Sequence, residues 1–153
     1  MEDSDHELYY ELICYTLEHP DKDYFIHQHV VDAYTAQMAD FKTKPIAIIF
    51  ALAGLYLFLE KDYSGKQVQM AHILMSKYKK VWPAINLPHQ RGEVTFLHAL
   101  EAPSGMERDI MIKKWCISVW HAYEESHETI ASLLSEYLFT PGMRICRIKD
   151  SDR

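Results

Sequence analysis

The sequence predicts an all-α protein, a single domain built as an antiparallel helical bundle of about five helices. Apolar residues recur at spacings of three and four over most of the chain, as they do on one face of a helix. Helix-start signals precede several of these stretches, and no segment alternates apolar and polar residues as a half-buried strand does. A chain of 153 residues buries one core comfortably, so we expect one domain over residues 1–153 with its core in residues 5–138.

The first two helices are predicted from their caps and their stops. Ser4 followed by Glu7 fits a capping box, and an apolar face continues until Pro20, which predicts a helix over about residues 5–18. Asp21 or Asp23 can cap a second helix that runs to about residue 39.

The third and fourth helices follow a proline and a second capping box. Pro45 suits the first position of a helix because its missing N–H has no intrahelical partner there. The apolar run over residues 46–59 predicts a helix surrounded by the rest of the core. Ser64 and Gln67 form the next capping-box pattern, and helical spacing predicts a helix that ends near Val81.

The second half of the chain predicts a long loop, a short helix and a long helix. Residues 82–92 contain two prolines and a glycine, so we expect an irregular segment, followed by a short helix over residues 95–101. Ser104 and Glu107 fit a third capping box. The apolar face behind it predicts one long helix, or two nearly collinear ones, before a loose tail over residues 139–153.

Composition narrows the classes of partner and the compartment. Sixteen basic residues against 22 acidic ones give a net charge of −6, and the basic residues are scattered, so we expect no nucleic-acid partner. The longest apolar run has 14 residues, fewer than the ~20 that span a bilayer, and no signal sequence is evident. We therefore expect a cytoplasmic protein without a membrane partner. Its three cysteines, Cys14, Cys116 and Cys146, favour buried free thiols over a disulfide.

The stretch IHQHVVDAYTAQ, residues 26–37, sets polar side chains among apolar ones. On a helical wheel three of them point towards the core or lie at its edge: His27, Tyr34 and Gln37. Three others fall on the opposite side: Gln28, His29 and Asp32. On the same wheel His127 lies inward with Trp120 beside it, and His72 lies on the flank of the fourth helix. We therefore predict a polar pocket formed by His27, Tyr34, Gln37, Trp120 and His127.

Histidines from facing helices can build a metal site in a helical bundle. His27, His127 and His72 are the candidate ligands, and imidazole suits zinc, iron or nickel. The alternative is that each is a neutral core histidine whose ring nitrogens bond to carbonyls or hydroxyls. No segment places two clear ligands on one inward face, which favours the second interpretation.

Three segments carry a resemblance to a known family: residues 27–37, 54–60 and 115–127, which read HQHVVDAYTAQ, GLYLFLE and WCISVWHAYEESH. In this order they resemble the bacterial family catalogued as domain of unknown function 5946, over roughly Leu8 to Leu134. Six polar or aromatic positions match: His27, Asp32, Tyr34, Gln37, Trp120 and His127. Some family members begin with a Cys-x-x-Cys-Gly zinc element, which this chain lacks, so the resemblance implies no zinc role from that element and no mechanism.

Two functional hypotheses follow. The first is a helical-bundle binding or interaction protein, for a protein or small-molecule partner, in which the His/Tyr/Gln residues form a core network with Asp32 as a structural member. In that network Gln37 would bond to a buried loop carbonyl, and Asp32 would accept from a tryptophan N–H or cap a helix. The second is a small metal-dependent hydrolase or transferase with histidine ligands and an activated water. The first is favoured because no spacing fixes two ligands together.

Overall fold

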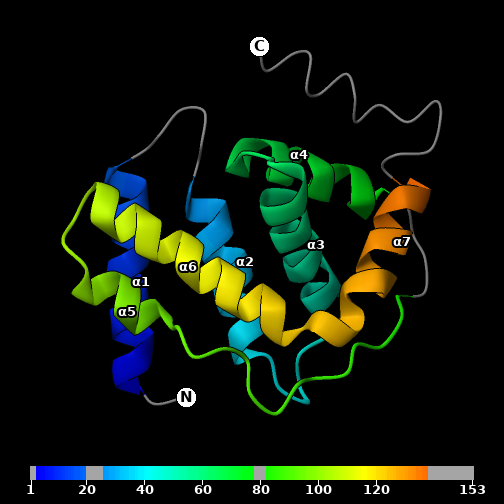
Figure 1. Cartoon of the computed structure of the whole chain (residues 1–153), viewed down its shortest axis with the longest axis horizontal. Helices are drawn as coiled ribbons and strands as arrows, with labels where there is room; N and C mark the ends of the chain where they lie inside the picture. The colour runs from blue at the N-terminus through cyan, green and yellow to red at the C-terminus, as the bar shows by residue number, and fades with distance from the viewer. Residues whose placement is uncertain (1–2, 20–25, 78–81, 138–153) are drawn as a thin grey trace.

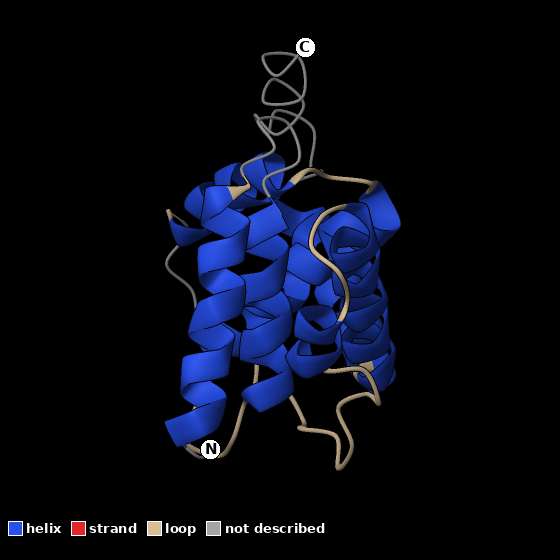
Figure 2. Ribbon diagram, turned by 90° about the vertical axis from the view of Figure 1, so that its left-hand side faces the viewer, coloured by secondary structure: helices blue, strands red, loops and turns tan. Residues whose placement is uncertain are grey.

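The computed structural model describes residues 3–19, 26–77 and 82–137, and every regular element in them is helical (Figure 1). The elements are α1 (Asp3–Glu18), α2 (Ile26–Met38), α3 (Pro45–Lys61), α4 (Gly65–Ser76), α5 (Phe96–Glu101), α6 (Met106–Ala122), the 3-10 turn η1 (Glu124–Ser126) and α7 (His127–Tyr137). Figure 2 shows the same part of the chain as helices and loops without a strand. The all-α prediction is confirmed. The described residues form seven α-helices rather than about five, and one reason is that the predicted long last helix is divided into α6 and α7.

Two of the predicted starts agree with the structure. Lys44 precedes α3 and Pro45 occupies its first turn. At α4 the capping box is complete. The backbone N–H of Gln67 donates to Ser64 Oγ at 3.2 Å, and the backbone N–H of Ser64 donates to Gln67 Oε1 at 2.9 Å. Such reciprocal bonds satisfy donors that have no partner inside the helix. The short helix α5 also forms, with Thr95 as its N-cap.

Two other predicted starts are wrong. Ser4 lies inside α1, which already begins at Asp3. Ser104 caps nothing, because Gly105 is the residue before α6 and adopts a φ of 100°, a conformation that glycine tolerates. The Gly105 amide donates to the Tyr15 hydroxyl at 3.0 Å, so contact with α1 decides where α6 begins. The predicted cap of the second helix, the predicted end of the fourth near Val81, and the tail over 139–153 lie outside the described residues.

The long last helix is broken rather than collinear. α6 ends at Ala122, Tyr123 leaves helical geometry at φ −93° and ψ 25°, and α7 turns away from the axis of α6 (Figure 1). The His127 ring stacks back on Trp120, with ring centroids 3.7 Å apart. Hydrophobic periodicity continues through this break because α7 also buries apolar residues, Ile130 and Leu134, so the sequence pattern does not reveal the turn.

The centre of the fold is α2, which contacts α1, α3, α4 and α6. α3 is the apolar helix expected at residues 46–59, and side chains all around it are buried, among them Ile49, Leu52, Leu55 and Leu57. In the described ranges, no helix combines the length and the apolar character that crossing a membrane requires. Because α2 is packed on several sides, it has little solvent-facing surface, and most of its polar residues lie against other helices.

Candidate functional site

The three histidines predicted as metal ligands contact different parts of the structure. His27 Nδ1 lies 3.0 Å from the Thr16 hydroxyl of α1. That hydroxyl donates to the Ile13 carbonyl, so it accepts from an Nδ1–H of His27. His72 Nε2 donates to the Phe50 carbonyl of α3 at 2.8 Å. Burial lowers the pKa of both imidazoles, which favours their neutral forms.

His127 bonds within its own part of the chain. Its Nε2 donates to the Trp120 carbonyl at 2.6 Å, and the indole of Trp120 donates from Nε1 to Glu60 Oε1 at 3.1 Å. The structure thus brings His127 and Trp120 together, whereas His27 and His72 bond to α1 and α3. Over residues 3–19, 26–77 and 82–137 no group of three His, Cys, Asp or Glu side chains is arranged to hold a metal ion.

Tyr34 and Gln37, the other members of the predicted pocket, also have separate surroundings. The ring of Tyr34 stacks on Tyr9 of α1, with centroids 3.5 Å apart and planes 6° from parallel. Gln37 Nε2 donates to the carbonyls of Arg91 at 3.1 Å and Val94 at 2.8 Å, and its Oε1 accepts from Trp115 Nε1 at 2.8 Å. The expectation that Gln37 bonds to a loop carbonyl is therefore confirmed, although the two residues that supply the carbonyls are half-buried.

The prediction that Gln28, His29 and Asp32 face away from the core is wrong. His29 has 0% and Asp32 3% of its surface exposed, and Gln28 is half-buried. The wheel assumed one inward direction, but α2 is covered by helices on several sides. The His29 ring stacks on Phe58 of α3 at 3.6 Å, and burial, with a smaller contribution from Lys113, lowers the pKa of His29 to about 3. Its imidazole is neutral near pH 7.

Asp32 packs directly against Gly54 of α3. A Cβ placed on Gly54 would lie 1.8 Å from Asp32 Oδ2, closer than any real contact, so only glycine leaves room for this carboxyl. Asp32 Oδ1 accepts from Gln28 Nε2 at 3.0 Å, not from a tryptophan as expected, while Oδ2 has no hydrogen-bond partner among the described residues. Burial raises the pKa of Asp32 well above its usual value, so the group favours the neutral acid.

The cysteines divide between core and surface. Cys116 is buried with a free thiol, its Sγ lies 3.7 Å from the His29 carbonyl, and burial raises its pKa. This agrees with the expectation of a buried free thiol. Cys14 is also free but exposed on α1, which corrects the same expectation for that residue. Cys146 lies outside the described residues.

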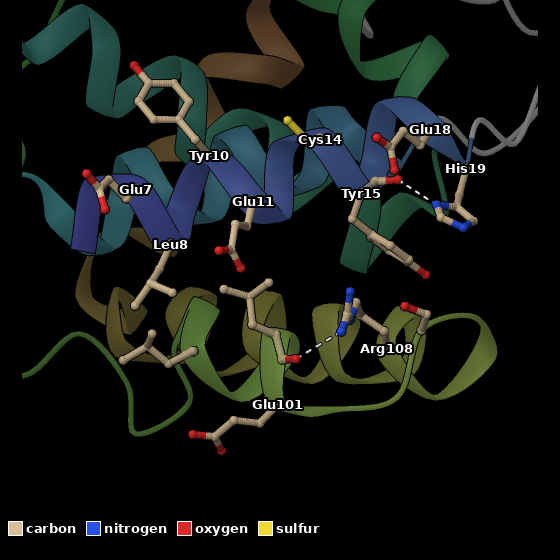
Figure 3. Close-up of a pocket in the computed structure, with 13 residues that line it drawn as sticks. Glu7, Leu8, Tyr10, Glu11, Cys14, Tyr15, Glu18, His19, Glu101 and Arg108 are labelled. Carbon is tan, nitrogen blue, oxygen red and sulfur yellow. Dashed lines mark hydrogen bonds between the residues drawn. The ribbon is translucent and has the colours of Figure 1, made fainter. Parts of the chain in front are cut away.

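A groove lies between α1 on one side and α5 with the start of α6 on the other, and it encloses about 680 Å³ (Figure 3). Small-molecule and cofactor sites commonly have volumes of about 300–1,000 Å³. Figure 3 shows Leu8 and Glu11 pointing from α1 towards α5, and Tyr15 beside Arg108 further along. Leucines line the groove from both sides, Leu8 from α1 and Leu97 and Leu100 from α5.

The groove is strongly acidic. Four exposed carboxylates line it, namely Glu7, Glu11, Glu18 and Glu101. The fixed positive charge in the lining is Arg108, so with His19 neutral the lining carries four negative charges and one positive, a net −3. Four of the 22 acidic residues of the chain therefore surround one hollow.

Arg108 is held at the back of this groove by the end of α5. Its guanidinium donates to the Leu100 and Ala102 carbonyls, both at 2.9 Å from Nη2, and lies 4.7 Å from the centre of the Tyr15 ring. The Tyr15 hydroxyl in turn donates to Asp109 Oδ1 at 2.8 Å. Burial and this bond raise the pKa of Tyr15. Hydrogen bonds thus fix this side of the groove, and the Arg108 guanidinium already bonds to carbonyls of the protein itself.

Sequence reasoning missed this groove although a signal was present. Glu7, Glu11, Cys14 and Glu18 follow one another at spacings of four, three and four, which places them on one face of a helix. This row of acidic residues lies on the solvent-facing side of the helix, where charged residues are ordinary and by themselves indicate no groove. The opposing wall, including Glu101 and Arg108, comes from residues about 90 positions later, and no local pattern announces that pairing.

The comparisons with known proteins give one result. A model of a family of unknown function, DUF5946, matches residues 4–124. The chain belongs to this family. No curated protein and no solved structure matches it. The expected resemblance is confirmed, although His127 lies just beyond the matched range.

The three segments that the sequence singled out, residues 27–37, 54–60 and 115–127, contact one another in the structure. Asp32 of the first meets Gly54 of the second, and Gln37 of the first accepts from Trp115 of the third. Glu60 of the second accepts from Trp120 of the third. The Tyr123 hydroxyl of the third donates to the Ala36 carbonyl of the first at 2.5 Å. These three segments therefore build the junction of α2, α3 and α6, and both this junction and the acidic groove lie within the matched range, residues 4–124.

Proposed function

We propose that this protein is a non-catalytic binding protein whose groove between α1 and α5 takes a basic, partly apolar polypeptide segment. The observation that carries the proposal is the net −3 lining around an apolar floor. Opposite charge steers a partner to the groove, and buried leucine surface supplies affinity that charge alone does not. The polar residues of α2 then have a structural role, because their hydrogen bonds join helices.

Three features of the lining support a peptide as occupant. Leu8, Leu97 and Leu100 offer apolar surface for aliphatic side chains. The exposed carboxylates Glu7, Glu11 and Glu18 are spread over three turns of α1, which suits an elongated ligand with several positive charges. Tyr10 is 57% exposed at the same edge and adds aromatic surface for a cation or an aliphatic stem.

A binding experiment tests this proposal. A fluorescein-labelled peptide of alternating lysine and leucine is titrated with the full chain, and anisotropy is measured. We expect saturable binding that weakens roughly five-fold in the Glu11→Gln/Glu101→Gln variant, because each exposed charge pair contributes about 0.5 kcal/mol. Glu93→Gln, which removes an exposed carboxylate outside the groove, is the matched control. Equal affinity for a peptide of alternating glutamate and leucine would contradict the proposal.

The metal-dependent hydrolase or transferase stays an untested prediction. It would need ligands beyond His27, His72 and His127, since these three hydrogen bond to α1, α3 and the end of α6. Elemental analysis of untagged protein prepared without chelator measures whether zinc, iron or nickel is bound in stoichiometric amount.

We also propose that the protein functions in the cytoplasm. The free, exposed thiol of Cys14 supports this, because thiols persist in a reducing compartment. Mass measurement of the protein isolated under alkylating conditions checks it, and we expect Cys14 to be alkylated rather than oxidised.

A further inference from the structure

From the charge pattern of the chain we infer that the segment over residues 143–149 of a second copy occupies the acidic groove. This inference rests on the proposed function and names its partner. The segment reads MRICRIK and combines three basic residues with four apolar ones and no acid. Its charge of +3 balances the net −3 of the groove lining.

The side chains of this segment match both parts of the groove. Arg144, Arg147 and Lys149 supply cations for the exposed glutamates of α1 and α5, and arginine in particular forms bidentate bonds to carboxylates. Met143, Ile145 and Ile148 supply aliphatic surface for the leucine floor. The other basic stretch, Lys77–Lys80, reads KYKK and contains no aliphatic residue for the leucine floor.

The path length favours a second copy over the same chain. α7 and α1 lie towards opposite ends of the long axis of the molecule (Figure 1). A domain of this length has a radius of gyration of about 15 Å, hence a diameter of about 40 Å. Residues 138–142 bridge at most about 20 Å when fully extended. Two copies that exchange these segments fill both grooves and close a symmetric dimer.

Two cysteines make this arrangement testable. Cys14 lines the α1 side of the groove with a free thiol, and Cys146 is the central residue of the segment. The full chain is treated with diamide, which oxidises a pair of adjacent thiols to a disulfide and is itself reduced to the hydrazine. We expect a covalent dimer whose tryptic map contains the Cys14–Cys146 linkage, and its absence from both Cys14→Ser and Cys146→Ser.

Charge variants separate docking from random collision. We expect Glu11→Gln/Glu101→Gln to slow formation of the Cys14–Cys146 dimer roughly five-fold, as removal of two exposed charge pairs predicts. The control Glu93→Gln is expected to leave the rate unchanged. An excess of a synthetic peptide of residues 141–151 with serine in place of Cys146, which can compete for the groove but cannot form a disulfide, is expected to suppress the linkage. An unaltered rate in the groove variant, or no suppression by the peptide, would overturn the inference.

The remaining outcomes are also decisive. A Cys14–Cys146 linkage found within single chains would overturn the assignment to a second copy. If the lysine–leucine peptide binds in the groove but this linkage does not form, the inference fails while the proposed function stands. If neither peptide binds, both fail. Light scattering of the untreated chain provides an independent check, because we expect dimers that dissociate to monomers in Arg144→Gln/Arg147→Gln.

Discussion

At the scale of single residues, Asp32 of α2 packs closely against Gly54 of α3. The carboxyl is 3% exposed, one oxygen accepts from Gln28, and the other lies where a Gly54 side chain would be. A buried acid of this kind is costly unless it is neutral or hydrogen-bonded. Glycine in the interior of α3 is also unfavourable by about 1 kcal/mol relative to alanine, so its presence here is explained by the packing of Asp32.

Gly54→Ala tests this packing. We expect it to lower the free energy of unfolding by about 2 kcal/mol, because the added methyl would overlap Asp32 Oδ2. Urea denaturation of both single variants and of Asp32→Ala/Gly54→Ala completes a double-mutant cycle. The combined loss should fall short of the sum by at least about 1 kcal/mol, and simple additivity would count against direct contact.

Asp32 also predicts a dependence of stability on pH. Because burial raises its pKa in the folded state, the folded protein holds a proton that the unfolded chain releases above about pH 4. The stability it contributes is complete below that pH and declines as pH rises through the folded pKa. In this window we expect the wild type to lose about 1.4 kcal/mol per pH unit relative to Asp32→Asn. Urea unfolding at a series of pH values measures both slopes, and parallel slopes would refute the assignment.

At the scale of the elements, α2 holds the others in place through side chains that bond to loops and helices. Gln37 connects the loop before α5 to Trp115 of α6, and Arg91 donates back to the carbonyls of Gln37 and Ala39. Because this loop leads into α5, the network positions one wall of the groove. It does so without contributing a ligand of its own to that groove.

Gln37→Leu should loosen this connection. We expect a loss of about 2 kcal/mol in unfolding free energy, because the buried Trp115 and the half-buried Arg91 and Val94 carbonyls lose their hydrogen-bond partner. Amide hydrogen exchange should accelerate in residues 91–95 more than in α4. Gln69→Leu, a half-buried glutamine of α4 outside this network, is the matched control and should change stability by less than about 0.5 kcal/mol. Similar effects of both substitutions would argue against a specific role for Gln37.

The elements also show what sequence reasoning can and cannot supply. Caps whose donors and acceptors are a few residues apart, such as Ser64 with Gln67, could be predicted because their physics is local. The burial of the second face of α2 could not be predicted. A helical wheel identifies one inward face, and it carries no information on how many helices pack around α2. The break at Tyr123 was missed for a related reason, since both α6 and α7 bury an apolar face.

At the scale of the whole molecule, the described structure separates a packed junction from an acidic surface. Residues 27–37, 54–60 and 115–127 meet at the junction of α2, α3 and α6, while α1, α5 and the start of α6 form the groove. Part of the negative charge of that groove could be predicted from the sequence, because Glu7, Glu11 and Glu18 recur at helical spacing on one face of α1. The hollow itself could not be predicted, because it forms only where α5 packs against α1, and these helices are far apart in the sequence.

The most direct test of the account is a map of the bound peptide by NMR. Backbone amide shifts of the isotopically labelled full chain are followed as the unlabelled lysine–leucine peptide is added. We predict that the largest changes fall on α1 around Glu11 and on α5 around Glu101, and that they shrink as salt rises because exposed charge pairs are screened. Shift changes centred on other elements, or none at all, would contradict the assignment of this groove as the binding site.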